Sequence, residues 1–281
     1  MLEHDVQEKI IRQNRTFMKG IRREDPYFDS FQSDQDQKLP QPPLVKAPMV
    51  EKEYRIDLPR NFDSLAMKDT LPQLLARRRS SRVYSGEAMT LQQLSFLLYA
   101  TQGITGIRGR QYAALRPVPS GGARHPFETY LLVQQVTGLT PGAYHYLPMT
   151  HQLEYLGTPD DMDQSIRSAL LEQAWAAQAN VLFFWSVVAY RAEWRYGIYA
   201  HRTALIDVGH VGQNLYLSAG ALGLGACAIA AFQDEICSSL FGLDGTEEFI
   251  VYTAVVGTVR GEDAAREKAF YAFLDEDHSE F

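Results

Sequence analysis

Four arginines and two serines stand together in the run R-R-R-S-S-R, from Arg77 to Arg82. The chain has a formal net charge of -7 at pH 7, so this concentration of positive charge is a local feature. Guanidinium forks and serine hydroxyls supply bidentate donors and charge to a phosphate ester. The run also follows an apolar pattern at Leu71, Leu74 and Leu75, and the helix dipole favours arginines at a helix C-terminus. Taken alone, the run is compatible both with a phosphate-binding motif and with an ordinary helix C-terminus.

Two glycine-rich segments have compositions that suit a flat ligand. In V-P-S-G-G-A-R-H-P-F-E, Val118 to Glu128, the turn exposes backbone N–H groups and its glycines permit close approach. In A-L-G-L-G-A-C-A-I-A-A-F, Ala221 to Phe232, the small residues are suited to one wall of a slot for a planar ring. A plain turn explains the first segment as well, and a tightly packed core turn explains the second.

A third segment, W-R-Y-G-I-Y-A-H-R (194–202), leads into D-V-G-H-V-G-Q-N-L (207–215). Helical spacing places Asp207, His210 or Val211, and Asn214 on one face. Gly209 and Gly212 form a separate stripe that lets another element pack closely, and a buried helix–helix contact explains them equally well. We interpret His210 as a hydrogen-bonded helix residue rather than a catalyst.

The bulk composition restricts the class of protein. A length of 281 residues permits one large domain or two small ones, and 46% hydrophobic residues can form a sizeable core. The acidic balance argues against a nucleic-acid partner. The two cysteines, Cys227 and Cys237, have no disulfide framework and no metal-ligand spacing, so we expect no metal site. The charged N-terminus lacks a signal-peptide core, and no apolar window is long enough for a membrane span; both predict a cytoplasmic protein without membrane contact.

The first 65 residues differ from the rest of the chain. They are polar, and the sequence L-P-Q-P-P-L-V-K-A-P over residues 39–48 favours extended backbone. We predict an N-terminal arm over residues 1–65, with one helix at 5–16 followed by an extended strap, and a single domain over residues 66–281. Too little of the arm is apolar for it to form a domain of its own.

Within this domain, helices and strands are interspersed. Thr70, which precedes Leu71-Pro72, is a helix cap candidate, and Thr90-x-x-Gln93 is a capping box before a helix that ends near Thr101. Residues 102–126 have the composition of a loop. The remaining patterns predict strands at 128–136, 143–147, 152–156, 180–190 and 249–259, and helices at 160–178 and 200–222, with Gly223 and Gly225 ending the second of these. A hairpin among interspersed helices predicts an α+β sheet, and the absence of G-x-G-x-x-G between a strand and a helix disfavours a dinucleotide-binding fold.

In this order and spacing, the segments resemble the FMN-dependent nitroreductase superfamily. They are most similar to its SagB-type dehydrogenase branch, which includes the thiazole/oxazole-forming oxidases. The similarity covers about residues 70–260, and F-M-K-G (17–20) and D-Q-K-L-P-Q-P-P (36–43) add a weaker similarity in the arm. The resemblance implies a mostly antiparallel sheet of four or five strands flanked by helices, in an obligate domain-swapped homodimer with FMN at the interface.

The resemblance also implies which residues bind the flavin. The R-R-S-x-R motif, which grips the phosphate, the ribityl chain and the N1/O2 edge of the ring, corresponds to Arg78, Arg79, Ser80 and Arg82, so Arg77 is left as a solvated residue. The loop from the other subunit that covers the ring corresponds to Pro119, Ser120, Gly121 and Gly122, with Arg124 beside it. The segment that lines the ring near N5 corresponds to Ile229, Ala230 and Ala231. Arg260 is the candidate for a basic residue that completes the phosphate site after the last strand.

The azoline-oxidising members of this branch carry a Lys-Tyr pair where this chain has Arg195 and Tyr196. Arginine stays charged at any ordinary pH, so Arg195 is a poor general base, and this departure puts azoline oxidation in doubt. We expect Tyr196 to relay a proton or to orient a substrate; an interface Arg–Tyr pair is the alternative.

The functional hypothesis is therefore an FMN-dependent oxidoreductase that transfers hydride through flavin N5, to or from a small organic or peptide-derived substrate. A nitro- or quinone reductase that uses NAD(P)H as electron donor is the first alternative. A non-enzymatic subunit, which binds flavin or docks within a peptide-modification complex, is the second. A yellow flavoprotein would separate the first two hypotheses from a docking module that has lost its flavin site.

Overall fold

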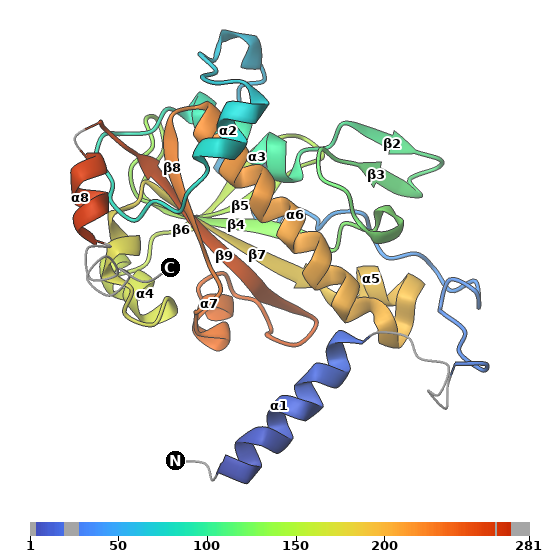
Figure 1. The fold of residues 1–281 in the computed structure, drawn as a ribbon. Helices are drawn as coiled ribbons and strands as arrows, with labels where there is room; N and C mark the ends of the chain where they lie inside the picture. Colours follow the sequence, from blue (N-terminus) through green and yellow to red (C-terminus); the bar gives the residue numbers. More distant parts are fainter. Residues whose placement is uncertain (1–3, 20–27, 262, 271–281) are drawn as a thin grey trace.

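The computed structural model describes residues 4–19, 28–261 and 263–270, and they build a seven-stranded sheet covered by helices on both faces (Figure 1). The strand order is β1-β6-β5-β4-β7-β9-β8, and each neighbouring pair is antiparallel. These strands are β1 (Arg55–Asp57), β4 (Phe127–Val133), β5 (Gly142–Leu147), β6 (Gln152–Gly157), β7 (Val181–Val188), β8 (Leu224–Ile229) and β9 (Glu248–Thr258). The prediction of an α+β fold with a central antiparallel sheet is confirmed.

The sheet is wider than the four or five strands that the resemblance implies. The hairpin of β5 and β6 extends it beyond β4, and β1, from the predicted N-terminal arm, pairs with β6 through Arg55 opposite Glu154. A separate two-stranded sheet, β2 (Gly106–Arg108) and β3 (Ala113–Leu115), lies inside the segment predicted as a loop. Backbone pairing in this hairpin is compatible with a loop-like composition, because only three residues of each strand take part.

The described residues form eight α-helices, the first of which extends away from the sheet (Figure 1). They are α1 (His4–Met18), α2 (Leu71–Arg77), α3 (Leu91–Gln102), α4 (Met162–Ala169), α5 (Ala189–Tyr196), α6 (Ala200–Ala221), α7 (Asp234–Ser239) and α8 (Asp263–Phe270). Successive residues of a strand point to opposite faces, so β7 serves both layers. Phe183 and Trp185 pack into the core beneath α3 and α6, whereas Leu182 and Phe184 pack into the core beneath α4 and α7.

The helix ends largely follow the sequence signals. The capping box of α3 is formed, with the Gln93 N–H donating to Thr90 Oγ1 at 3.1 Å. Gly223, at φ +70°, terminates α6 as predicted. Gly225 does not: it lies within β8, where a Cβ would come 2.7 Å from the Cβ of Ser81. The predicted helix over 160–178 is instead α4 followed by a 3-10 helix, Ala174–Gln178.

The predicted boundary at residue 65 stays a prediction, as does the domain swap. Gly20 of the F-M-K-G segment, residue 262 and residues 271–281 at the end of the predicted domain lie outside the described residues. Within the described ranges, no helix combines the length and apolar character that crossing a membrane requires.

Candidate functional site

The arginine run follows α2 and lies beside the edge strand β8. The Ser81 N–H donates to the Ala226 carbonyl at 2.9 Å, so the run extends the edge of the sheet by one backbone hydrogen bond. The Tyr216 hydroxyl, from α6, accepts from the Ala228 N–H at 2.8 Å and lies 2.8 Å from Ser80 Oγ. One phenol therefore ties the run, the edge strand and the long helix together.

Three arginines of the run have distinct surroundings. Arg77 forms an ion pair with Asp69 at 2.9 Å, which uses its charge locally. The Arg78 guanidinium lies 5.2 Å from the centre of the Tyr216 ring, a cation–π distance. Arg78 and Arg79 are exposed and line a cavity of about 80 Å³ that also includes Arg77 and Tyr216. The structure thus brings Arg78 and Arg79 together with the phenol that contacts Ser80.

Arg82 and Arg260 lie elsewhere. The Arg82 guanidinium is 5.4 Å from the Trp175 ring centre, and its backbone N–H donates to the Glu267 carboxylate of α8 at 3.0 Å. Arg260 forms an ion pair with Glu87 at 2.6 Å, beyond the end of β9. Neither residue lines the cavity beside Arg78, so their predicted contribution to a phosphate site stays a prediction.

The loop of Pro119 to Gly122 is anchored to α6 by a single carboxylate. Ser120 Oγ donates to Asp207 Oδ2 at 2.7 Å, and the Gly121 N–H donates to the same oxygen at 2.9 Å. The Ser120 hydroxyl oxygen in turn accepts from the His125 N–H at 2.9 Å. Burial raises the pKa of Asp207, although these hydrogen bonds favour its charged form. The sequence placed Asp207 on a helix face but gave no partner for it.

The same loop lies against the end of α5. Gly122 has φ +56°, and a Cβ there would come 2.6 Å from Arg195 Nε and 2.7 Å from the Tyr196 hydroxyl. Both the backbone conformation and the space therefore require glycine. The two predicted catalytic residues thus contact the loop that the resemblance places over the flavin.

Arg124 and two aromatic rings complete this second cluster. The Arg124 guanidinium is 4.9 Å from the Tyr112 ring centre and 5.4 Å from the Trp194 ring centre. Its Nη2 donates to the Tyr112 carbonyl at 2.7 Å, so Arg124 holds the β2–β3 hairpin against α5. Tyr112 and Tyr216 were not predicted as site residues, because a lone tyrosine carries no spacing signal that identifies its partner.

The two clusters lie at different points along α6. Asp207, beneath the loop, and Tyr216, beside Arg78, are nine residues apart, which corresponds to about 14 Å along the helix. Ile229 ends β8 as a buried residue, and Ala230 and Ala231 follow it as exposed residues. His210 is exposed on α6 between the two clusters.

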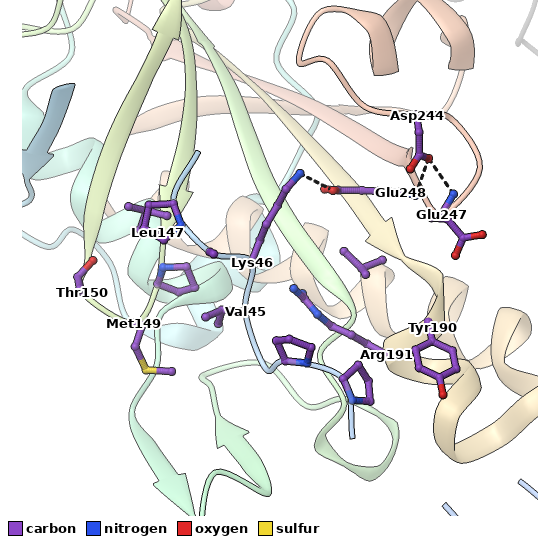
Figure 2. A pocket seen from close by; sticks show the side chains of 16 residues that line it. Val45, Lys46, Leu147, Met149, Thr150, Tyr190, Arg191, Asp244, Glu247 and Glu248 are labelled. Carbon is purple, nitrogen blue, oxygen red and sulfur yellow. Dashed lines mark hydrogen bonds and ion pairs between the residues drawn. The ribbon is translucent and has the colours of Figure 1, made fainter. Parts of the chain in front are cut away.

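A larger cavity, of about 800 Å³, lies at the other end of α5 (Figure 2). The proline-rich strap forms one wall, and its Lys46 donates to Glu248 Oε2 at 2.6 Å and to the Tyr130 hydroxyl at 2.9 Å. The cavity is lined by Pro42, Pro43, Val45, Lys46, Ala47, Pro48, Leu147, Pro148, Met149, Thr150, Val188, Tyr190, Arg191, Asp244, Glu247 and Glu248. Most of these side chains are apolar, so the cavity suits the apolar body of a ligand.

Buried carboxylates attach the strap to the sheet. Glu128 accepts from the Lys46 N–H at 2.7 Å and pairs with Arg191 at 2.6 Å. Glu154 accepts from the Met49 N–H at 2.8 Å and lies 2.6 Å from Nδ1 of His145. The Nε2 of His145 lies 3.2 Å from Glu128, so one imidazole links the two carboxylates. In the described part of the chain, no three His, Cys, Asp or Glu side chains form a group able to hold a metal ion.

Fold and site together describe an α+β protein with two polar clusters along one long helix. The model of the Nitroreductase family matches residues 75–258, about two thirds of the chain, so the protein belongs to this family. "Putative nitroreductase MJ1384" of Methanocaldococcus jannaschii is 35% identical over 165 residues, which are 59% of this chain and 80% of that protein.

Two relatives of lower identity are named as processing proteins. The trifolitoxin-processing protein TfxB of Rhizobium leguminosarum bv. trifolii is 29% identical over 46% of this chain, and the microcin B17-processing protein McbC of Escherichia coli is 29% identical over 46%. These matches span 36% of TfxB and 49% of McbC, half or less of either relative. The solved structure of the E. coli microcin synthetase McbBCD complex with truncated pro-MccB17 shares the fold, with a TM-score of 0.54 and 20% identity over 77% of this chain and 85% of the matched chain.

Proposed function

We propose that this protein is an FMN-dependent oxidoreductase of the SagB type, acting on a small organic or peptide-derived substrate. The observation that carries the proposal is the cluster of Arg78, Arg79 and Ser80 around Tyr216 at the edge of β8. Guanidinium groups and a hydroxyl on one small cavity are the donors that a phosphate ester requires. This donor set fits FMN, whose phosphate distinguishes it from riboflavin.

Bound FMN would supply the two-electron chemistry, by accepting or releasing a hydride at N5. The residues of this chain would hold the phosphate with Arg78 and Arg79 and orient Ser80 through Tyr216. The Asp207 carboxylate would keep the covering loop in place, so that Gly121 and Gly122 can approach a flat ring closely. Ile229, Ala230 and Ala231 would line the same ring.

The relatives support a peptide-derived substrate, because TfxB and McbC are named for peptide processing. The apolar cavity of Figure 2 lies at the start of α5, and Arg195 and Tyr196 lie at the end of the same helix. The two ends of a helix of this length are about 10 Å apart. A substrate of several residues would span this distance. An NAD(P)H-dependent nitro- or quinone reductase is the second candidate, favoured by Arg195, which cannot serve as the base that azoline oxidation needs.

The test compares FMN and riboflavin binding to the apoprotein, using the matched variants Arg78→Ala and Arg77→Ala. Arg78→Ala should weaken FMN binding about 10- to 100-fold, since a hydrogen bond to a charged group contributes about 1.5–3 kcal/mol. Riboflavin binding should change little, because riboflavin has no phosphate. Arg77→Ala should weaken FMN binding much less than Arg78→Ala, because Arg77 lines the same cavity but is paired with Asp69.

Equal losses for FMN and riboflavin in Arg78→Ala would show that Arg78 does not bind the phosphate. A colourless protein that cannot be reconstituted with FMN would refute the flavoprotein proposal altogether. Flavin reduction by NADPH and by NADH, followed with a panel of acceptors, then separates the reductase candidate from the dehydrogenase candidate.

A further inference from the structure

The hydroxyl of Tyr112 accepts two hydrogen bonds from residues that no sequence motif connects. Arg195 Nη1 donates to Tyr112 Oη at 2.9 Å. Gln35 Nε2, from the predicted N-terminal arm, donates to the same oxygen at 3.0 Å. The backbone of Tyr112 is held as well, because its carbonyl accepts from Arg124 Nη2 and from Gln41 Nε2. Tyr112 is thus held by three distant parts of the chain, two of which bind its phenol oxygen, and the residue is still 40% exposed.

The hydrogen-bond donors and the cations around this oxygen favour the phenolate. The hydrogen bond from Gln35 is the largest cause of a pKa for Tyr112 below its ordinary value; slight burial opposes it, and the charges of Arg195 and Arg124 reinforce it. Arg195 also lies over the Tyr196 ring, at 5.6 Å from its centre. The carboxylate of Asp36 interacts with Arg195 as well, and a 2.7 Å hydrogen bond from the Ser33 hydroxyl holds it in place.

We propose that Tyr112 is the proton acceptor of this site, its phenolate oxygen taking the proton that leaves the substrate during dehydrogenation. The proposal rests on the proposed function, because it requires a flavin covered by the loop of Gly121 and Gly122. Gly122 packs directly on Arg195 and Tyr196, and Arg195 in turn donates to the Tyr112 hydroxyl. A single side chain therefore separates this hydroxyl from the loop. Arg195 is then a positioning residue: it donates to the phenolate and stays charged throughout.

With FMN bound, a substrate C–H bond would break, and its hydride, with both electrons, would pass to the oxidised flavin. An N–H or C–H bond on the adjacent substrate atom breaks, its electron pair forms the new double bond, and its proton forms the O–H bond of Tyr112. The phenol returns that proton to water, and a two-electron acceptor such as dioxygen or a quinone reoxidises the flavin. Each turnover therefore removes two hydrogens from the substrate.

The first test needs no flavin and no substrate. Tyrosinate absorbance of the apoprotein is titrated for the native chain, Tyr112→Phe and, as a matched control, Tyr54→Phe, which removes the hydroxyl of another exposed tyrosine. The difference between the native chain and Tyr112→Phe should show one tyrosine that ionises below the ordinary tyrosine pKa. Arg195→Gln should move that ionisation to higher pH, whereas Arg195→Lys should largely preserve it. A Tyr112 that ionises at or above the ordinary value overturns the proposal.

The second test follows flavin reduction in the loaded protein by stopped flow, with a synthetic peptide that carries one thiazoline. The native rate should rise with pH and level off at the Tyr112 ionisation measured in the first test. Tyr112→Phe should reduce the rate about 100-fold or more and abolish that pH dependence, as for the loss of a general base. Tyr54→Phe should retain the native rate and profile.

The outcomes separate the two proposals. The role of Tyr112 is overturned if the native protein and Tyr112→Phe have the same rate and pH profile, or if the native protein leaves the flavin oxidised with this peptide. In either case, a yellow protein that binds FMN retains the proposed function. If the native chain fails to bind FMN although Tyr112 ionises below the ordinary tyrosine pKa, the proposed function is refuted instead.

Discussion

Asp207 offers a sharp test of how α6 positions the loop of Pro119 to Gly122. Its carboxylate accepts from Ser120 Oγ at 2.7 Å and from the Gly121 N–H at 2.9 Å, and the side chain is 6% exposed. Asp207→Ala removes the oxygen that accepts both hydrogen bonds and leaves two part-buried donors unpaired. Each unpaired donor costs about 1–3 kcal/mol, and the serine hydroxyl is free to rotate, so we expect a loss of about 2–4 kcal/mol in the free energy of unfolding.

Asp207→Asn is the matched control, because its carbonyl oxygen can take the place of Oδ2 and accept both of these hydrogen bonds. The replacement also removes the cost of burying a charge. Burial raises the pKa of Asp207 in the folded protein, so the stability contributed by this group is fully present below the unfolded pKa and is lost as the pH rises through the folded pKa. We therefore expect Asp207→Asn to gain stability relative to the native chain as the pH rises through that range.

The assay is thermal and urea unfolding of the three proteins at several pH values. A loss of about 3 kcal/mol corresponds to a melting-temperature decrease of about 6–12 °C for a chain of this size. FMN affinity serves as a second readout, and it should fall in Asp207→Ala because the loop is no longer held. A change within about 0.5 kcal/mol for Asp207→Ala, or equal losses for Ala and Asn, would refute the assignment of Asp207 as the anchor.

Two further predictions concern the strap and the assembly. Burial opposes ionisation of Glu154, but hydrogen bonds from His145, Met49 and Val50 lower its pKa, so its contribution to stability is present above the unfolded pKa and is lost as the pH falls through the folded pKa. Glu154→Gln should therefore flatten the acid side of the stability–pH curve measured by urea unfolding; an unchanged curve would exclude this role. The flavin-loaded protein should be a homodimer by light scattering, and a monomer that retains FMN would contradict a site shared between subunits.

The parts of the fold that depend on neighbouring residues could be predicted from the sequence. The capping box at Thr90 and Gln93 and the glycine after α6 act within a few residues, so their outcome is visible in the sequence. Strand β8 was missed because its residues, Leu224 to Ile229, are mostly small and read equally well as a turn. Its place at the edge is decided by pairing with β9, a contact between segments far apart in the chain.

The candidate site likewise has a part that a local motif predicts and a part that tertiary contacts determine. Arg78, Arg79 and Ser80 were predicted from a compact motif, and the structure brings them together around one phenol. The partners that give these residues their chemistry come from elsewhere: Tyr216 is 136 positions beyond Ser80, and Gln35 is 77 positions before Tyr112. A single sequence holds no signal for such pairs, because tertiary packing alone sets their distance.

The geometry of α6 gives a reason for a second copy of the chain. The loop anchored by Asp207 and the proposed phosphate cluster beside Tyr216 contact α6 at points about 14 Å apart along the helix, so α6 holds them apart within one chain. Leu205 and Ile206, 50% and 56% exposed, leave an apolar face on this helix near Asp207. Two copies related by a two-fold axis, with their α6 helices antiparallel across this face, would set the loop of one subunit against the phosphate cluster of the other. Burial of these exposed apolar side chains would then provide the free energy that assembles the shared site.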